Sequence, residues 1–160
     1  MKRISVFFAT ILFVFLCGCG PTKSESYYDY KTKCIGSELD GSYTLRSWGR
    51  ARNEADAYQQ ARKQAVYDVI FSYIDAASSG QSNLIPLLLE VNAEKKYSTY
   101  FDRFFRDGGE YLKYSSMKEK RDFSTKYYRT NSQALCQTTV CVFRAKLKEK
   151  LIEDKILKTE

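Results

Sequence analysis

The chain has 160 residues, no histidine, and 26 basic against 19 acidic side chains, which gives a formal net charge of +7. The absence of histidine removes the commonest general base, the usual imidazole ligand of zinc and the base of the familiar catalytic triads. We therefore expect no enzymatic activity, no metal and no cofactor. Basic and acidic residues are interleaved along the chain, a pattern that favours a solvated surface over a polyanion-binding site.

Residues 1–18 have the features of an export signal. Lys2 and Arg3 form a short positive start, and the run 4–16 that follows is almost wholly apolar. As a helix this run would be about 20 Å long, short of the ~30 Å hydrocarbon core of a bilayer. The pattern predicts a signal peptide over residues 1–18, and a permanent N-terminal transmembrane anchor is the alternative.

The run closes on Leu16-Cys17-Gly18-Cys19, which resembles the lipobox of bacterial lipoproteins. Cys17 departs from the small residues usual at its position, and the bulky Leu16 before it makes it a poor acceptor. The resemblance implies that Cys19 carries the lipid, and three acyl chains at ~0.8 kcal/mol per buried CH₂ would anchor the protein firmly. An ordinary secretory signal with incidental cysteines is the alternative reading. Gly20, where Asp would retain such a protein in the inner membrane, points to the outer membrane of the cell envelope, and we expect a periplasm-facing protein.

The remainder of the chain has the length of one domain. Cleavage after Gly18 would leave 142 residues with a net charge of +5. Residues 19–32 are predicted to form the lipidated cysteine and a flexible polar tether, and residues 33–160 a single domain.

Residues 33–39 and 42–48 are predicted to form a hairpin. Asp40-Gly41 between them is a strong two-residue turn signal, in which both positions need a positive φ. A metal-binding loop is the alternative for this dipeptide, but no further spaced acidic residues follow it.

Two helices are expected next. Asn53 is a good N-cap, and apolar side chains then recur at helical spacing until residues 78–80. An apolar run over 84–89 follows, and a second helix is predicted to begin near Asn92 and to stop at Gly108-Gly109.

The C-terminal third alternates as strands and ends in a helix. A strand is predicted over 110–117 that resumes over 123–129 after a charged bulge or loop, followed by a second strand over 134–145 and a helix over 145–158. The approximate order is β-β-α-α-β-β-α. Strands close in sequence tend to pair antiparallel, so we expect an α+β fold: a two-layer sandwich whose mainly antiparallel sheet is covered by helices on one face.

Three cysteines would remain as thiols in the mature chain. In an oxidising periplasm Cys34 could form a disulfide with Cys136 or Cys141, and the alternative is that each is a buried free thiol. Cys136 and Cys141 would face opposite sides of one strand, so they are not expected to pair with each other.

A basic and aromatic stretch over 111–129 is the candidate partner surface. Such residues suit anionic glycans or an acidic protein, and nucleic acid is not expected for an exported protein. The alternative is the polar outer face of a sheet. The candidate residues are Lys113, Tyr114, Lys118, Lys120, Arg121, Phe123, Lys126, Tyr127, Tyr128 and Arg129.

The run 49–70 contains a Gly-Arg-Ala step followed by an alanine-rich helix with alanines four residues apart, and residues 140–156 read as a strand entering a helix. This pattern resembles the Lpp-twenty-like outer-membrane lipoproteins and the N-terminal domain of the flagellar outer-membrane T protein. The resemblance implies a small scaffold domain without catalytic residues. We expect a non-catalytic scaffold or adapter that contacts a protein partner in the envelope, and the alternative is a glycan- or peptidoglycan-binding module.

The lipid site gives a direct test. Labelled palmitate should be incorporated into the wild-type chain and into Cys17→Ala, and incorporation should be lost in Cys19→Ala because the acceptor sulfur is removed. The measurement is radiolabel or click-probe signal on the purified protein. Loss in Cys17→Ala with retention in Cys19→Ala would move the site.

Overall fold

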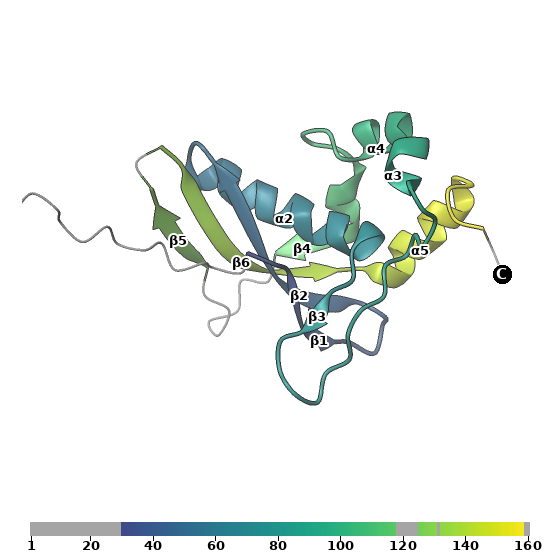
Figure 1. Ribbon diagram of the computed structural model, residues 1–160, viewed down its shortest axis with the longest axis horizontal. Helices are drawn as coiled ribbons and strands as arrows, with labels where there is room; N and C mark the ends of the chain where they lie inside the picture. The colour runs from purple at the N-terminus through teal and green to yellow at the C-terminus, as the bar shows by residue number, and fades with distance from the viewer. Residues whose placement is uncertain (1–29, 118–124, 131, 159–160) are drawn as a thin grey trace, which may run out of the picture.

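The computed structural model describes residues 30–117, 125–130 and 132–158. Its centre is a six-stranded sheet in the order β3-β1-β2-β6-β4, with β5 pairing with the same edge of β6 as β4. Helix α2 lies across one face of this sheet, and the remaining helices gather at one end of it (Figure 1). The α+β fold class expected from the sequence is thus confirmed, including the mainly antiparallel pairing.

The predicted hairpin is confirmed as β1 (Lys33–Ser37) and β2 (Tyr43–Ala51). Its turn differs from the two-residue type expected, because only Gly41 has a positive φ, of 76°. The Glu38 N–H donates to the Ser42 carbonyl, and the Gly41 N–H donates to the Glu38 carbonyl. This is the longer connection that closes on a left-handed glycine.

The helix predicted after Asn53 is α2 (Glu54–Phe71). The Asn53 side chain accepts a hydrogen bond of 2.8 Å from the Asp56 N–H, as an N-cap should. Ala57 and Ala61 are fully buried against the sheet. An added Cβ at Gly49 of β2 would lie 2.0 Å from the Ala57 carbonyl oxygen, so helix and strand meet backbone to backbone.

The predicted extension of α2 to residues 78–80 is wrong, because the helix ends at Phe71 and Ser72 is extended. The chain beyond it joins the sheet as β3 (Asp75–Ala76), parallel to β1. Ile74 forms an isolated bridge with Leu84. These pairings with distant residues override the helical periodicity that continues past Phe71.

The apolar run after Leu84 closes the end of α2. The Leu87 N–H donates to the Val69 carbonyl, and the Leu88 N–H donates to the Ile70 carbonyl. Carbonyls in the last turn of a helix lack partners within the helix, so the run satisfies two groups that would otherwise be buried without one.

The second predicted helix is divided into α3 (Ala93–Lys96) and α4 (Ser98–Phe104) at Tyr97. Both pieces are short, and α4 inserts Phe101 and Phe104 into the core. The Phe101 ring lies edge-on to other aromatic rings at 4.8 to 6.4 Å between centroids, which is the usual geometry of an aromatic cluster.

The strand predicted over 110–117 is wrong for its first five residues, which form the 3-10 helix η2 (Glu110–Tyr114) before β4 (Ser115–Met117). The cause is a side chain more than 45 residues away. The Arg62 guanidinium of α2 donates to the Leu112 and Ser115 carbonyls and to the Ser115 hydroxyl. It thereby holds a turn that extended backbone could not make.

The last elements are β5 (Lys126–Arg129), β6 (Ala134–Val142) and α5 (Arg144–Glu153). Their order is as predicted, but β6 ends at Val142 where the strand was predicted to reach residue 145, and α5 ends at Glu153 where the helix was predicted to reach residue 158. The two long strands β2 and β6 pair along their whole length, from Tyr43 opposite Val142 to Ala51 opposite Ala134. In the part of the chain that the structure describes, no helix combines the length and apolar character needed to cross a bilayer.

Cys34, Cys136 and Cys141 are all buried free thiols, so of the two alternatives the possible disulfide of Cys34 is wrong and the buried free thiol is confirmed. Cys34 lies opposite Leu45 on β2, which lies opposite Val140 on β6. Two inter-strand spacings amount to about 9.5 Å, beyond the ~7 Å that a disulfide can bridge. Burial raises the pKa of the Cys34 thiol and raises that of Cys136 to about 11.

Gly49→Ala is expected to destabilise the domain by about 3 kcal/mol or to prevent folding, because the new methyl group meets the α2 backbone. Gly36→Ala in β1 is the matched control, since a Cβ there meets nothing within 4 Å. Urea denaturation followed by circular dichroism measures both. Equal midpoints for the two variants would contradict the close packing of α2 on β2.

Candidate functional site

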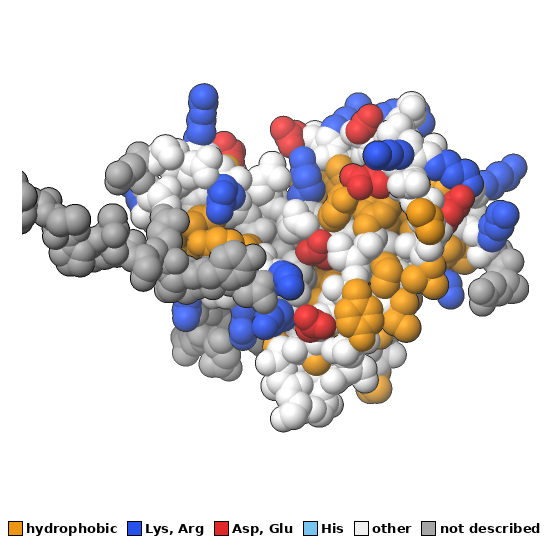
Figure 2. Space-filling model, viewed as in Figure 1, with side chains coloured by type: hydrophobic (Ala, Val, Ile, Leu, Met, Phe, Trp, Pro, Cys, Tyr) orange, Lys and Arg blue, Asp and Glu red, His pale blue; other side chains and the backbone are white. Residues whose placement is uncertain are grey.

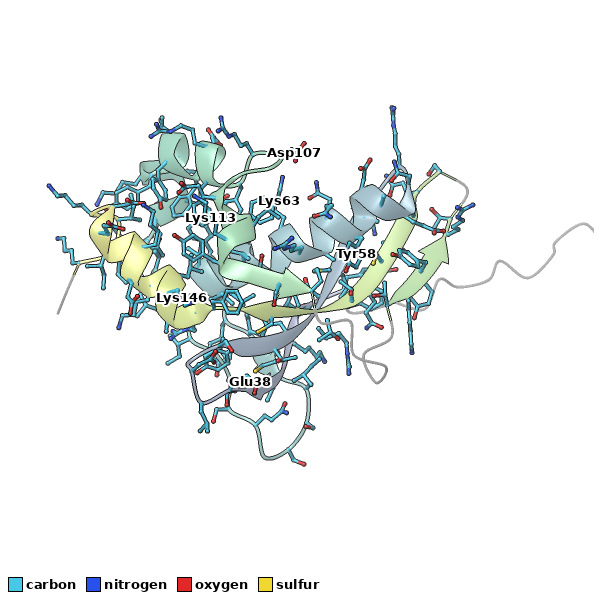
Figure 3. All side chains as sticks on the ribbon, turned by 180° about the vertical axis from the view of Figure 1, so that it is seen from behind. Glu38, Tyr58, Lys63, Asp107, Lys113 and Lys146 are labelled. Carbon is cyan, nitrogen blue, oxygen red and sulfur yellow. The ribbon has the colours of Figure 1, made fainter. Side chains whose placement is uncertain are left out.

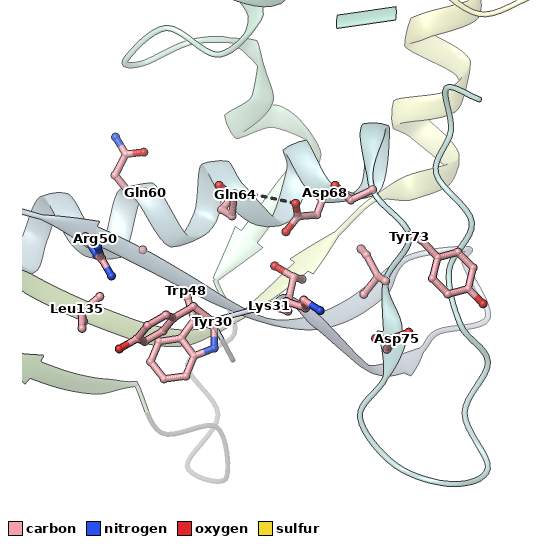
Figure 4. Close-up of a pocket in the computed structure, with 14 residues that line it drawn as sticks. Tyr30, Lys31, Trp48, Arg50, Gln60, Gln64, Asp68, Tyr73, Asp75 and Leu135 are labelled. Carbon is pink, nitrogen blue, oxygen red and sulfur yellow. Dashed lines mark hydrogen bonds between the residues drawn. The ribbon is translucent and has the colours of Figure 1, made fainter. Parts of the chain in front are cut away.

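A groove lies beyond the end of the pairing between β1 and β2. β1 pairs with β2 only as far as Arg46, and no other described strand pairs with the same edge from Ser47 to Ala51. A cavity of about 590 Å³ opens beside this edge, beneath α2 (Figure 4). We call it the β2 groove. Its lining residues are Tyr30, Lys31, Thr32, Trp48, Gly49, Arg50, Gln60, Gln64, Asp68, Ser72, Tyr73, Ile74, Asp75 and Leu135.

Four polar residues four positions apart, on α2 and just after it, line the β2 groove: Gln60, Gln64, Asp68 and Ser72. Residues at this spacing lie one above another on a helix, so they form a polar row. The Gln64 amide donates a hydrogen bond of 2.9 Å to Asp68 Oδ1, marked in Figure 4. The row is about 18 Å long at the rise of a helix.

Asp68 is the buried polar centre of the β2 groove, with 9% of its surface exposed. Its carboxylate accepts hydrogen bonds from the side chains of Thr32, Gln64 and Ser72, while burial raises its pKa above the ordinary value. The Thr32 hydroxyl also pairs with the Ser47 hydroxyl at 3.2 Å. No basic side chain among the described residues forms an ion pair with Asp68.

Aromatic side chains form the rim of the β2 groove at the end away from Asp68. Tyr30 and Trp48 meet edge to face with ring centroids 5.1 Å apart, and Tyr128 of β5 lies 5.8 Å from Trp48. The Arg50 guanidinium lies 5.7 Å from the centre of the Tyr30 ring. Tyr30 and Tyr128 are 41% and 38% exposed, so the rim offers aromatic surface to solvent.

The β2 groove is lined by both basic and acidic side chains. Lys31 and Arg50 line the β2 groove together with Asp68 and Asp75. Figure 2 shows basic and acidic side chains interspersed over the same side of the molecule. This agrees with the interleaving seen in the sequence, and it makes the site unlike a phosphate- or polyanion-binding patch.

The predicted partner surface over 111–129 is not brought together as one face. Lys118, Lys120, Arg121 and Phe123 lie outside the described residues. Lys113 and Tyr114 belong to η2, at the end of the molecule opposite β5 (Figure 3). Lys113 pairs with Glu110 at 3.4 Å, and Tyr114 stacks on Phe104 in the core.

The β5 residues divide between the two faces of the sheet. Tyr127 lies opposite Cys136, on the side of α2, where Arg129 also pairs with Glu54 at 3.0 Å. Tyr128, which contacts Trp48, is on the opposite face, as is Lys126 by alternation. Of the described residues of the predicted surface, those of this strand are the ones that border the β2 groove, through the contact of Tyr128 with Trp48. The predicted lipid site, Cys19, also lies outside the described residues.

A second hollow of about 640 Å³ lies beside Lys113. Both of its described acidic groups are paired: Lys150 pairs with Asp154 at 2.8 Å, and Lys113 pairs with Glu110 at 3.4 Å. The Tyr100 hydroxyl also donates to Asp154 at 2.7 Å. The β2 groove is the better candidate because it combines an exposed aromatic rim with a buried carboxylate that forms no ion pair with a described basic residue.

Comparison of the chain with models of protein families, with curated proteins and with solved structures finds no match. The resemblance to the Lpp-twenty-like lipoproteins therefore stays a prediction.

The buried state of Asp68 has a measurable consequence. An acid whose folded pKa is raised holds its proton longer in the native state, so its contribution to stability falls as pH rises from 3.8 through the folded pKa. Asp68→Asn removes this titration. The free energy of unfolding of the variant, minus that of the wild type, should therefore increase with pH above about 3.8, as measured by urea denaturation. A difference that decreases over this range would contradict the assignment.

Proposed function

We propose that the chain is a lipid-anchored protein of the bacterial envelope and that its folded domain is a non-catalytic adapter. The β2 groove is the place where it holds a protein partner. The observation that carries this proposal is the β2 groove, a cavity of about 590 Å³ lined by amide, carboxylate and aromatic side chains. A segment of another protein offers the donors, acceptors and apolar groups that match such a lining.

The rim supports the same conclusion. Tryptophan, tyrosine and arginine are the residue types that most often dominate the energy of protein–protein contacts. Trp48, Tyr30 and Arg50 contact one another beside the cavity. Their mutual packing holds them in place before a partner arrives, which lowers the entropic cost of binding.

The chemistry of the groove favours binding over catalysis. Asp68 and Asp75 are its acidic groups, and the Asp68 carboxylate is engaged by three donors. Cys34 and Cys136 are buried with raised pKa values, so both are protonated, unreactive thiols at neutral pH. We therefore keep the non-enzymatic assignment as part of the proposal.

The predicted anchor places the β2 groove near the membrane. Tyr30, on the rim, is eleven residues after Cys19, and a chain of that length reaches at most about 40 Å. A partner held in the groove would thus lie close to the membrane that carries the lipid. The apolar run 4–16 and the Leu16–Cys19 motif support this anchor.

A glycan- or peptidoglycan-binding module is the second candidate. The observation in its favour is the combination of an exposed aromatic rim with amide and carboxylate side chains, since Gln60, Gln64 and Asp68 offer both donors and acceptors. The experiment below separates the two candidates.

Two neighbouring arginines provide a matched pair for this test. Arg50 lines the β2 groove and Arg52 does not, and both are exposed. In crosslinked membranes, the wild type and Arg52→Glu should recover the same protein partner, and Arg50→Glu should reduce its recovery at least fivefold. Mass spectrometry of the purified complexes gives the measurement. Recovery of sacculus fragments without protein would favour the glycan candidate and contradict the adapter.

A further inference from the structure

We infer that a second surface of the domain, on the connection between β3 and α3, docks on the anionic face of the bilayer that carries the lipid anchor. We call this surface the loop patch and define it by its three exposed aliphatic residues, Ile85, Leu89 and Val91. The inference rests on the anchor in the proposed function and specifies how the domain is oriented on the membrane.

The loop patch presents aliphatic side chains to solvent. Ile85 is 57% exposed, Leu89 73% and Val91 84%. Figure 2 shows hydrophobic side chains gathered over the side of the molecule where this connection runs in Figure 1. Single apolar residues scattered over a surface need no explanation, but three within seven residues of one loop indicate a contact surface.

The backbone beneath the loop patch is fixed to the core. Leu87 and Leu88, between the exposed residues, are buried, and their N–H groups donate to two carbonyls in the last turn of α2. The Arg144 guanidinium of α5 donates a hydrogen bond of 3.0 Å to the Ile85 carbonyl. These contacts hold the loop in place before it meets a membrane, which lowers the entropic cost of docking.

Basic side chains border the loop patch. The Arg144 guanidinium lies at the Ile85 carbonyl, and Lys96 forms an ion pair with Glu90. The hydrogen bond from Lys96 lowers the pKa of Glu90, and the positive charge of Lys158 lowers it further. Three of the four charged groups that these contacts place at the loop are therefore basic. Such a border is complementary to anionic lipid headgroups.

The residue types of the loop patch favour lipid over a protein partner. Protein–protein contacts draw their energy mainly from tryptophan, tyrosine and arginine, and leucine and valine are under-represented among the dominant residues. Isoleucine, leucine and valine are instead among the residues that enter hydrocarbon most readily, while neighbouring basic side chains keep their charges at the headgroups. Apolar side chains beside basic ones are the combination that binds an anionic membrane interface.

The predicted anchor brings the loop patch within reach of the bilayer. Tyr30 is eleven residues after Cys19, a length that spans at most about 40 Å. A bilayer attached through so short a chain is present at a high effective concentration, so a weak contact is sufficient. The loop begins after Leu84, which pairs with Ile74 at the Tyr73 end of the β2 groove. The aromatic rim is at the other end of the groove (Figure 4), away from this contact.

The test uses the full lipidated chain on vesicles of phosphatidylethanolamine and phosphatidylglycerol whose acyl chains carry bromine, which quenches tryptophan at short range. The chain has one tryptophan, Trp48, so the wild type supplies the background. At least half of the fluorescence added by Leu89→Trp or by Val91→Trp should be quenched. Ala55→Trp is the control, because Ala55 is exposed and about 24 Å along α2 from its C-terminal end. It should lose less than a tenth.

The basic border has its own readout. Omission of phosphatidylglycerol should reduce the quenching of Leu89→Trp at least twofold, while the lipid anchor keeps the chain on the vesicle. Lys158→Glu in the same background should have the same effect, because it reverses one of the charges at the loop. Arg52→Glu, just before α2, should have none. Urea denaturation of each variant shows whether the fold is retained.

Three outcomes would overturn the inference. They are equal quenching at positions 89 and 55, quenching that does not depend on phosphatidylglycerol, and a dimer in detergent micelles that Leu89→Glu dissociates, since a second copy would then cover the loop patch. If one of them occurs while the chain incorporates palmitate and floats with the vesicles, the anchor stands and only the docking falls. A chain that does neither contradicts the anchor, and the docking falls with it.

Discussion

The backbone contact between α2 and β2 is the constraint on which the rest of the structure depends. Gly49 leaves no side chain between the strand and the Ala57 carbonyl, and Ala57 and Ala61 keep that side of the helix narrow. Because this narrow face packs directly on the sheet, the rotation of α2 about its own axis is fixed. Gln60, Gln64 and Asp68 must then lie along the edge of the sandwich, where the β2 groove forms.

Elements governed by local patterns could be predicted from the sequence. The hairpin of β1 and β2, the Asn53 cap and the strand β6 depend on nearby residues, and all three are present in the structure, although the turn is longer than the two-residue type predicted. The errors have distant causes. Phe71 ends α2 because the following residues join the sheet, and η2 exists because Arg62 reaches across to the Leu112 carbonyl. Periodicity within a segment carries no information about such partners.

The β2 groove could not be predicted for a related reason. It lies beyond the end of the β1–β2 pairing, which is set by the difference in length between β1, with five residues, and β2, with nine. No local sequence pattern shows where along β2 that pairing ends. The signal that was available is the polar row at four-residue spacing from Gln60 to Ser72. Beside an alanine row it resembles an ordinary solvated helix face. The basic and aromatic stretch was the more conspicuous feature, but alternation along β5 divides Tyr127 from Tyr128 between the two faces of the sheet.

The three buried thiols have a consequence for how the domain is stabilised. Cys34, Cys136 and Cys141 contribute to the domain as small apolar side chains and not as covalent crosslinks. The described domain is therefore held together by packing and hydrogen bonds, without a covalent crosslink among these cysteines. This sets it apart from small disulfide-rich domains, whose stability comes from their crosslinks.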